Sequence, residues 1–258
     1  MRWLVFAAVL VVWQFAVRAV SSGRQMDFPP PSAIAQRMAQ LWFSGPADHL
    51  FLTPEATGNI LPSVARLLTG WGLAAVAGVS VGLVLGRWPA ALDVVDPVIQ
   101  FSRAIPPPTL VPLFIVLFKL GTTMHVAVIA FGVVWPVLLN TIEGARSVDP
   151  VQLDTARSFH LTAAQRLGWV VLPATAPKIF AGLRISLSLA VILMVISEMV
   201  GSTNGIGFSL ISAQQNFQVT DVWAAIVLLG ILGYLLNTAL LWTEHRVLAW
   251  HQGTRGLD

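Results

Sequence analysis

The residues of this chain that could do chemistry are few, and their spacing argues against a metal centre or a nucleotide site. There is no cysteine, which excludes disulfides, thiolate catalysis and cysteine-ligated zinc. No G-x-x-x-x-G-K-[ST] stretch is present, so we do not expect the chain to bind ATP through such a loop. We expect no catalytic residue, no metal and no cofactor on this chain, because its histidines lack metal-ligand spacing: His49, His125, His160, His245 and His251.

A polar, charged stretch at residues 154–173 is the clearest candidate for a functional site. It lies between long apolar runs, and two helix-start signals accompany it. We predict a helix, a break at about 160–161 and a second helix that Pro173 ends, with Pro177 opening the next apolar segment. Such a short, rigid loop can transmit the displacement of a docked partner. The start signals are Asp149 followed by Pro150, and Thr162 followed at capping-box spacing by Gln165.

The composition indicates that lipid surrounds much of the chain. Of the 258 residues, 56% are hydrophobic and 10% are charged, and the mean hydropathy is +0.76. A soluble domain carries roughly 25% charged residues. The net charge of +3 does not indicate a nucleic-acid partner, because the basic residues are scattered between apolar runs. We therefore expect membrane lipid as a partner and no nucleic acid.

Six apolar runs predict an all-α integral membrane protein with about six transmembrane helices, since a span needs about 20 apolar residues. The run at 109–118 is short, and the segment 87–103 before it is expected to be a polar connection. Between the first two runs, Ser32 is expected to cap a short amphipathic helix that lies in the membrane interface or packs on the spans. The predicted spans are residues 3–17, 67–86, 109–118, 121–142, 179–200 and 222–243.

The distribution of lysine and arginine predicts the orientation of these spans. With the amino terminus inside, ten of the fifteen basic residues lie on the cytoplasmic side, which favours cytoplasmic amino and carboxyl termini. Residues 143–178, which contain the polar stretch, then form a cytoplasmic loop. We divide the chain into a first helix with an external amphipathic segment (1–59), a core (60–250) and a cytoplasmic tail (251–258).

Polar residues at membrane depth are candidates for a translocation path, because charges there are costly. Glu198 has two open interpretations: a group that gates the path or pairs with a basic neighbour, or an interfacial carboxylate in water, which we favour slightly. Arg66 is expected to reach the membrane surface, and residues 201–207 to form a flexible external loop. Lone polar residues more often bond helix to helix. The other path candidates are Asn140, Ser186 and Asn237, and small residues predict a close helix contact at Ala74, Gly78, Gly82 and Gly86.

The polar stretch resembles the EAA loop of binding-protein-dependent ABC transporter permeases, which reads E-A-A, three residues, G, nine residues, I-x-L-P. The spacing is kept in full, whereas Asp154 stands for glutamate and His160 stands for glycine. Residues 28–33, 140–142 and 147–150 resemble the branch that imports taurine, alkyl sulfonates and nitrate. The corresponding loop positions are Asp154, Thr155, Ala156, His160, Val170, Leu172 and Pro173, and Arg157 and Ser158 resemble that branch.

The resemblance implies a type I ABC importer permease with a MetI-like bundle in the bacterial inner membrane. It implies that the loop docks on a separate cytoplasmic ATPase, which would hold ATP and Mg²⁺. A second permease copy, favoured as a homodimer, and a periplasmic or lipid-anchored solute-binding protein would complete the importer. The expected solute is a small organic anion such as a sulfonate, or taurine or nitrate, with a vitamin precursor left open. An ion-coupled secondary carrier and a membrane-embedded enzyme remain alternatives.

Overall fold

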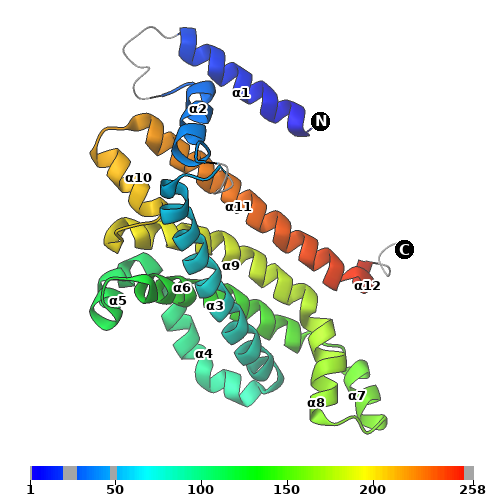
Figure 1. The fold of residues 1–258 in the computed structure, drawn as a ribbon. Coiled ribbons are helices and arrows are strands. Elements are labelled where there is room, and N and C mark those ends of the chain that lie inside the picture. Colours follow the sequence, from blue (N-terminus) through cyan, green and yellow to red (C-terminus); the bar gives the residue numbers. More distant parts are fainter. Residues whose placement is uncertain (1, 20–27, 47–50, 253–258) are drawn as a thin grey trace. The chain divides into compact units, whose positions relative to one another are not determined.

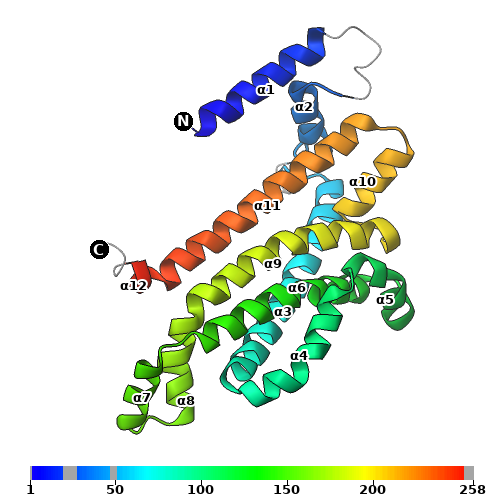
Figure 2. The same ribbon diagram turned by 180° about the vertical axis from the view of Figure 1, so that it is seen from behind.

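The computed structural model describes residues 2–19, 28–46 and 51–252, and every regular element within these ranges is helical (Figures 1 and 2). The predicted all-α class is therefore confirmed. The elements are α1 (Arg2–Ala19), α2 (Pro31–Trp42), η3 (Ala56–Ile60), α3 (Leu61–Arg87), α4 (Pro89–Ala104), η4 (Pro107–Leu110), α5 (Val111–Phe118), α6 (Thr122–Arg146), α7 (Pro150–Ser158), α8 (Ala163–Arg166), η5 (Leu167–Val171), α9 (Leu172–Gly201), α10 (Ile206–Gln215), α11 (Val219–Val247) and α12 (Ala249–Gln252).

The chain divides into two compact units. The first contains residues 1–65 and 195–232, and the second contains residues 66–194 and 233–258. Helices α3, α9 and α11 contribute residues to both units. The α7–α8 region belongs wholly to the second unit, and the segment around Glu198 belongs to the first.

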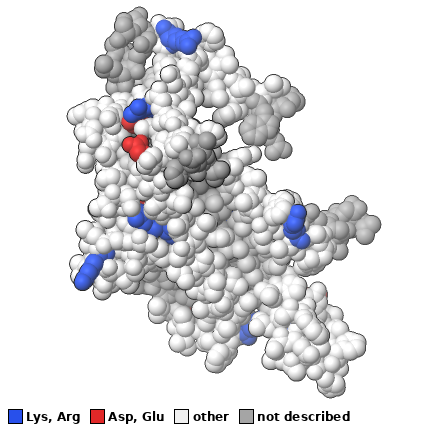
Figure 3. Space-filling view, viewed as in Figure 1, with Lys and Arg blue, Asp and Glu red and all other residues white. Residues whose placement is uncertain are grey.

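The helices are long and apolar enough for a membrane protein, but they do not fix the number of spans at six. Within the described ranges, four helical segments could cross a membrane, and α4 with η4 and α5, bent by 85°, would add a fifth if they form one span. Helix α1 is apolar but shorter, so six spans stays a prediction. Figure 3 shows few charged side chains on the face of the molecule that is viewed there. The four segments are Ala56–Arg87, Thr122–Arg146, Ala163–Gly201 and Val219–Val247.

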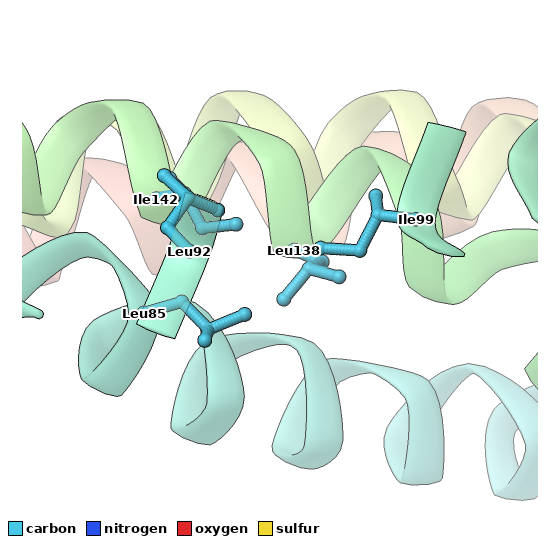
Figure 4. Close-up of a cluster of buried hydrophobic side chains, with 5 residues drawn as sticks. All are labelled: Leu85, Leu92, Ile99, Leu138 and Ile142. Carbon is cyan, nitrogen blue, oxygen red and sulfur yellow. The ribbon is translucent and has the colours of Figure 1, made fainter. Parts of the chain in front are cut away.

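The expected polar connection at residues 87–103 is wrong, because most of this segment is helix α4. Pro89 occupies the first turn, where the missing N–H of proline would have no helical partner. Two carboxylates lie between the apolar positions of α4, so the apolar stripe of this helix is not evident in the sequence. The buried side chains of this stripe pack on α3 and α6 in the cluster of Figure 4, which contains Leu85, Leu92, Ile99, Leu138 and Ile142.

Helix α6 forms the centre of the second unit, because it packs closely against α3 along the predicted stripe of small residues. A Cβ added at Gly78 would lie 2.9 Å from the side chain of Val137, and one at Gly82 would lie 2.6 Å from that of Thr141. Only glycine leaves room for such an approach of two backbones. Ala74 and Gly86 complete the stripe, and Gly86 faces Ala145 in the same way.

Helix α2 is held in the first unit by polar side chains, and the predicted cap is wrong. The N-cap is Pro30, and Ser32 instead exchanges two hydrogen bonds of 3.0 Å with the Gln14 amide of α1. Arg37 forms a bidentate ion pair with Asp221 of α11, with N–O distances of 2.5 and 2.9 Å. The hydrogen bond to Asp221 raises the pKa of Arg37.

Candidate functional site

The polar stretch forms a helical hairpin, which we define as residues 149–171 and call the α7–α8 hairpin. Asp149 caps α7 by accepting a hydrogen bond of 2.8 Å from the backbone N–H of Val151. Thr162 and Gln165 form a complete capping box at α8: the Gln165 side chain accepts from the Thr162 N–H at 2.9 Å, and the Thr162 hydroxyl accepts in return at 3.3 Å. Both predicted helix starts are therefore confirmed.

The turn between the two helices has the hydrogen bonds of a glycine-type helix end, although a histidine occupies it. His160 has φ of +54°, in the left-handed region. Its N–H donates to the carbonyl of Arg157 at 2.9 Å, and the N–H of Leu161 donates to the carbonyl of Ala156 at 3.0 Å. These two bonds define a Schellman motif, whose left-handed residue is usually glycine. The predicted break at 160–161 is confirmed. The backbone at His160 has the left-handed conformation that glycine would adopt more readily.

From the sequence we expected the second helix of the hairpin to end at Pro173, and this prediction is wrong. A π-helical turn at Leu167–Val171 joins α8 to α9, so that helix continues from Ala163 to Gly201 through Pro173 and Pro177. Wide turns of this kind are local adjustments that let a helix accommodate a proline, which cannot donate to the preceding turn. The hairpin is consequently continuous with a long apolar helix.

One side of the hairpin is packed firmly on the ends of the long helices. Val171 of η5 and Val148 before α7 are buried with Leu83 of α3 and Ala145 of α6, and Leu153 packs against this cluster. Polar contacts tie the same helices together close by. Arg87 of α3 donates to the carbonyl of Ala145 at 3.2 Å, and Lys178 of α9 forms an ion pair of 2.6 Å with Glu143 of α6.

The other side of the hairpin exposes large apolar side chains. The exposed fractions are 69% for Val151, 76% for Phe159 and 68% for Trp169. A groove of about 630 Å³ runs between α7 and η5 and is lined by Val151, Thr155, Trp169 and Pro173 among others. Exposed apolar patches of this kind mark contacts with other proteins or with the membrane.

The charged residues of the motif lie on the exposed surface. Asp154 and Arg157 form an ion pair of 2.8 Å within α7, and their side chains are 69% and 62% exposed. The Ser158 hydroxyl donates to the carbonyl of Asp154 at 3.0 Å, and Ala156 is buried. An exposed ion pair contributes little to stability. Its charges remain free to meet a partner.

Glu198 forms a second polar centre, in the first unit, and its predicted position in water is wrong. The side chain is fully buried. The Ser63 hydroxyl lies 2.8 Å from both carboxylate oxygens, and the N–H of Gly207 donates to one of them at 3.0 Å. The same hydroxyl accepts from the N–H of Ile206 at 2.8 Å. A buried carboxylate therefore holds the amino-terminal end of α10, where the helix dipole favours negative charge.

The predicted flexible loop at 201–207 is only partly correct, because Gly201 ends α9 and Gly207 lies within α10. Gly205 has φ of +118°, and its N–H donates to the Asn59 side chain at 2.9 Å. A Cβ at Gly205 would lie 2.5 Å from the Glu198 carboxyl carbon. No sequence pattern predicted α10, and none predicted Asn59 and Ser63 as partners of residues more than 130 positions away.

The remaining path candidates lie in the second unit. Ser186 is buried and accepts a hydrogen bond of 2.8 Å from the indole N–H of Trp71. Asn140 donates to the carbonyl of Pro136 in its own helix at 2.8 Å, and Asn237 is half-buried on α11. Arg66 is 5% exposed, so the prediction that it reaches the surface is wrong.

Residues 59–248 match the family model described as binding-protein-dependent transport system inner membrane component. The chain belongs to this family. The permease is 29% identical over 245 residues to the taurine transport system permease protein TauC of Escherichia coli (strain K12), covering 95% of this chain and 87% of TauC. It is 32% identical over 242 residues to the bicarbonate transport system permease protein CmpB of Synechococcus elongatus, covering 93% of this chain and 86% of CmpB.

The fold of the permease is also similar to a solved transporter. The inward-facing MetNI methionine ABC transporter matches with a TM-score of 0.64 at 20% identity, covering 73% of this chain and 94% of that chain. At this identity the likeness shows the fold alone, and it confirms the expected MetI-like bundle. The permease is thus a multi-pass inner-membrane transport subunit of the ABC type and not an enzyme. Its family implies an ATPase and a solute-binding protein as partners.

Proposed function

We propose that this permease imports a small solute that carries an oxyanion group, through an importer powered by a separate ATPase. The proposed solute is nitrate, bicarbonate or an organosulfonate such as taurine. Relatives that match almost the whole chain carry these solutes in their names: taurine, aliphatic sulfonates, bicarbonate and nitrate. What these solutes share is a small, oxygen-rich anionic group, and this shared chemistry supports the anion class.

The α7–α8 hairpin is proposed as the surface on which the ATPase docks. The observation that carries this proposal is that the two sides of the hairpin differ. One side is buried among the ends of α3 and α6, and the other exposes large apolar side chains. A partner that moves the exposed face would therefore also move the packed face. Because η5 continues into α9, the displacement would pass directly into a helix of the bundle.

Each residue of the motif has a proposed part in docking. Asp154 and Arg157 present charges to the ATPase, and Thr155 lines the groove beside α7. His160 sets the turn. Leu172 and Pro173 begin α9 and pass on the movement. Ala156 keeps α7 close to its packed neighbours, and Ser158 closes the last turn of α7.

The rest of the assembly is proposed from the distribution of basic residues and from the family. Ten of fifteen basic residues lie inside when both termini are cytoplasmic, which supports that orientation. ATP and Mg²⁺ are proposed on the ATPase, since this chain has no phosphate-binding loop. A second copy of the permease, as a homodimer, and an external solute-binding protein complete the proposed importer.

The path candidates divide into two proposed roles. Glu198 is proposed to fix the amino-terminal end of α10 and so to shape the external end of the path, because it is buried among donors from α3 and α10. Asn140, Ser186 and Asn237 are proposed to line or stabilise the helices along the path. The ion-coupled carrier and the membrane-embedded enzyme are set aside, because the family is one of ABC transport subunits.

The test is uptake by proteoliposomes that contain the permease, the ATPase encoded beside it and its binding protein. Labelled taurine, nitrate and bicarbonate are supplied outside, with ATP inside. We expect ATP-dependent uptake of one of these three solutes, and no uptake of methionine. ATP-dependent uptake of methionine but of none of the three would contradict the proposed solute class while leaving the importer mechanism intact.

A further inference from the structure

A pocket lies on the side of the α7–α8 hairpin opposite the groove proposed for the ATPase. It has a volume of about 620 Å³ and is bounded by the end of α3, by α7 and by α8 with η5. Leu153 and Arg157 of α7 line it, whereas Val151 and Thr155 line the groove. Residues two positions apart on a helix point in nearly opposite directions. The two hollows therefore use different faces of α7.

The walls of the pocket combine arginine with apolar side chains. Three guanidinium groups line it, from Arg87, Arg157 and Arg166, and no carboxylate does. Arg87 donates one hydrogen bond to a backbone carbonyl, and Arg157 pairs with Asp154 outside the lining. The Nε of Arg166 is buried and has no hydrogen-bond partner among the described residues. An unsatisfied buried donor is costly, so a ligand that accepts from it would be favoured.

The apolar part of the pocket continues along an exposed strip of α3. Val84 of α3 and Trp88, which directly follows this helix, line the pocket and are 58% and 62% exposed. Leu73 and Val76, on earlier turns of the same helix, are 55% and 70% exposed. Tryptophan at the end of a membrane helix is typical of the level of lipid headgroups. The pocket thus joins a basic end to an apolar track that follows a membrane helix.

We propose that this pocket binds an anionic glycerophospholipid of the phosphatidylglycerol type. Its phosphate would lie between Arg87 and Arg166, since Arg157 is paired with Asp154, and one acyl chain would follow Val84 along α3. A free inorganic anion would leave the apolar walls without a role, which is why we assign the site to a lipid. Basic pockets beside cytoplasmic helix ends are known to hold anionic lipid headgroups. The placement at the cytoplasmic boundary rests on the proposed function, whereas the chemistry of the pocket does not.

The test measures lipid retained by the purified chain, without ATPase, by native mass spectrometry in micelles doped with phosphatidylglycerol or phosphatidylcholine. We expect phosphatidylglycerol to be retained selectively. Arg87→Gln and Arg166→Gln should each weaken its retention about fivefold, since a basic group near an anionic headgroup contributes about 1 kcal/mol. Arg166→Lys should retain it, which separates charge from folding. Arg103→Gln on α4, outside the pocket lining, is the matched control.

Three results would overturn the proposal. One is equal retention of both lipids. Another is equal phosphatidylglycerol retention by wild type and both arginine-to-glutamine variants; a separate loss of ATPase binding by these variants would then make the pocket part of the protein interface. The third is displacement of the lipid by millimolar inorganic phosphate, which would assign the site to a soluble anion. Since lipid retention is read without transport, failure of the proposed solute class would not affect it.

Discussion

At the scale of single residues, the hairpin shows how a motif can keep its geometry while it loses its usual residue. His160 adopts the left-handed conformation with both Schellman hydrogen bonds formed. An L-residue in this region carries a cost of about 1 kcal/mol that glycine does not. Neighbouring structure must therefore hold His160 in place, including the cap of α8 at Thr162.

His160→Gly should raise the stability of the purified chain by about 1 kcal/mol, and His160→Val should lower it, because a β-branched residue is worst in the left-handed region. Thermal unfolding in detergent measures both. A glycine variant that is less stable than the valine variant would contradict the Schellman assignment.

Glu198 and Ser63 should behave as one unit, because the carboxylate and the hydroxyl are mutual partners in a buried site. We expect Glu198→Ala to cost about 3 kcal/mol or more, since it leaves several buried donors unpaired. Ser63→Ala should cost less on the Glu198→Ala background than in the wild type. Additive losses in this double-mutant cycle would show that the two side chains act independently.

At the scale of elements, the structure shows what could and could not be read from the sequence. The caps at Asp149 and Thr162 depend on residues within one turn, so local spacing was sufficient to predict them. Helix α4 was missed because its charges interrupt the apolar stripe, and its burial depends on α6, far away in the chain. The contact between Glu198 and Ser63 was missed because these residues are 135 positions apart in the chain. The continuation of helix through Pro173 was missed because a π-helical turn leaves no clear sequence signal.

The close approach of α3 and α6 gives a prediction with an internal control. Gly82→Val should destabilise the chain by about 3 kcal/mol or prevent its folding, because a Cβ there lies 2.6 Å from Thr141. Gly72→Val on the same helix meets nothing within 4 Å and should be tolerated. The folded yield after extraction in mild detergent compares the two. Equal yields would contradict the close packing.

At the scale of the whole molecule, the predicted orientation can be tested directly, because the chain has no cysteine. Phe159→Cys, in the exposed turn of the hairpin, should react with a membrane-impermeant maleimide only after the cytoplasmic side is opened. Gln215→Cys, at the end of α10, should react in intact cells after removal of any outer barrier. The reverse pattern would invert the topology and move the hairpin away from any cytoplasmic partner.

The account depends most on the docking of an ATPase at the α7–α8 hairpin, and recovery of the ATPase with the detergent-solubilised permease tests this directly. Wild type is compared with Asp154→Lys, with the exchange Asp154→Lys and Arg157→Asp, and with the control Asp93→Lys on α4. We predict that wild type and control recover the ATPase. Asp154→Lys should no longer recover the ATPase. The exchange should not restore its recovery, because we expect the ATPase to bind the negative charge at position 154. Equal recovery by all four chains would contradict docking through this face.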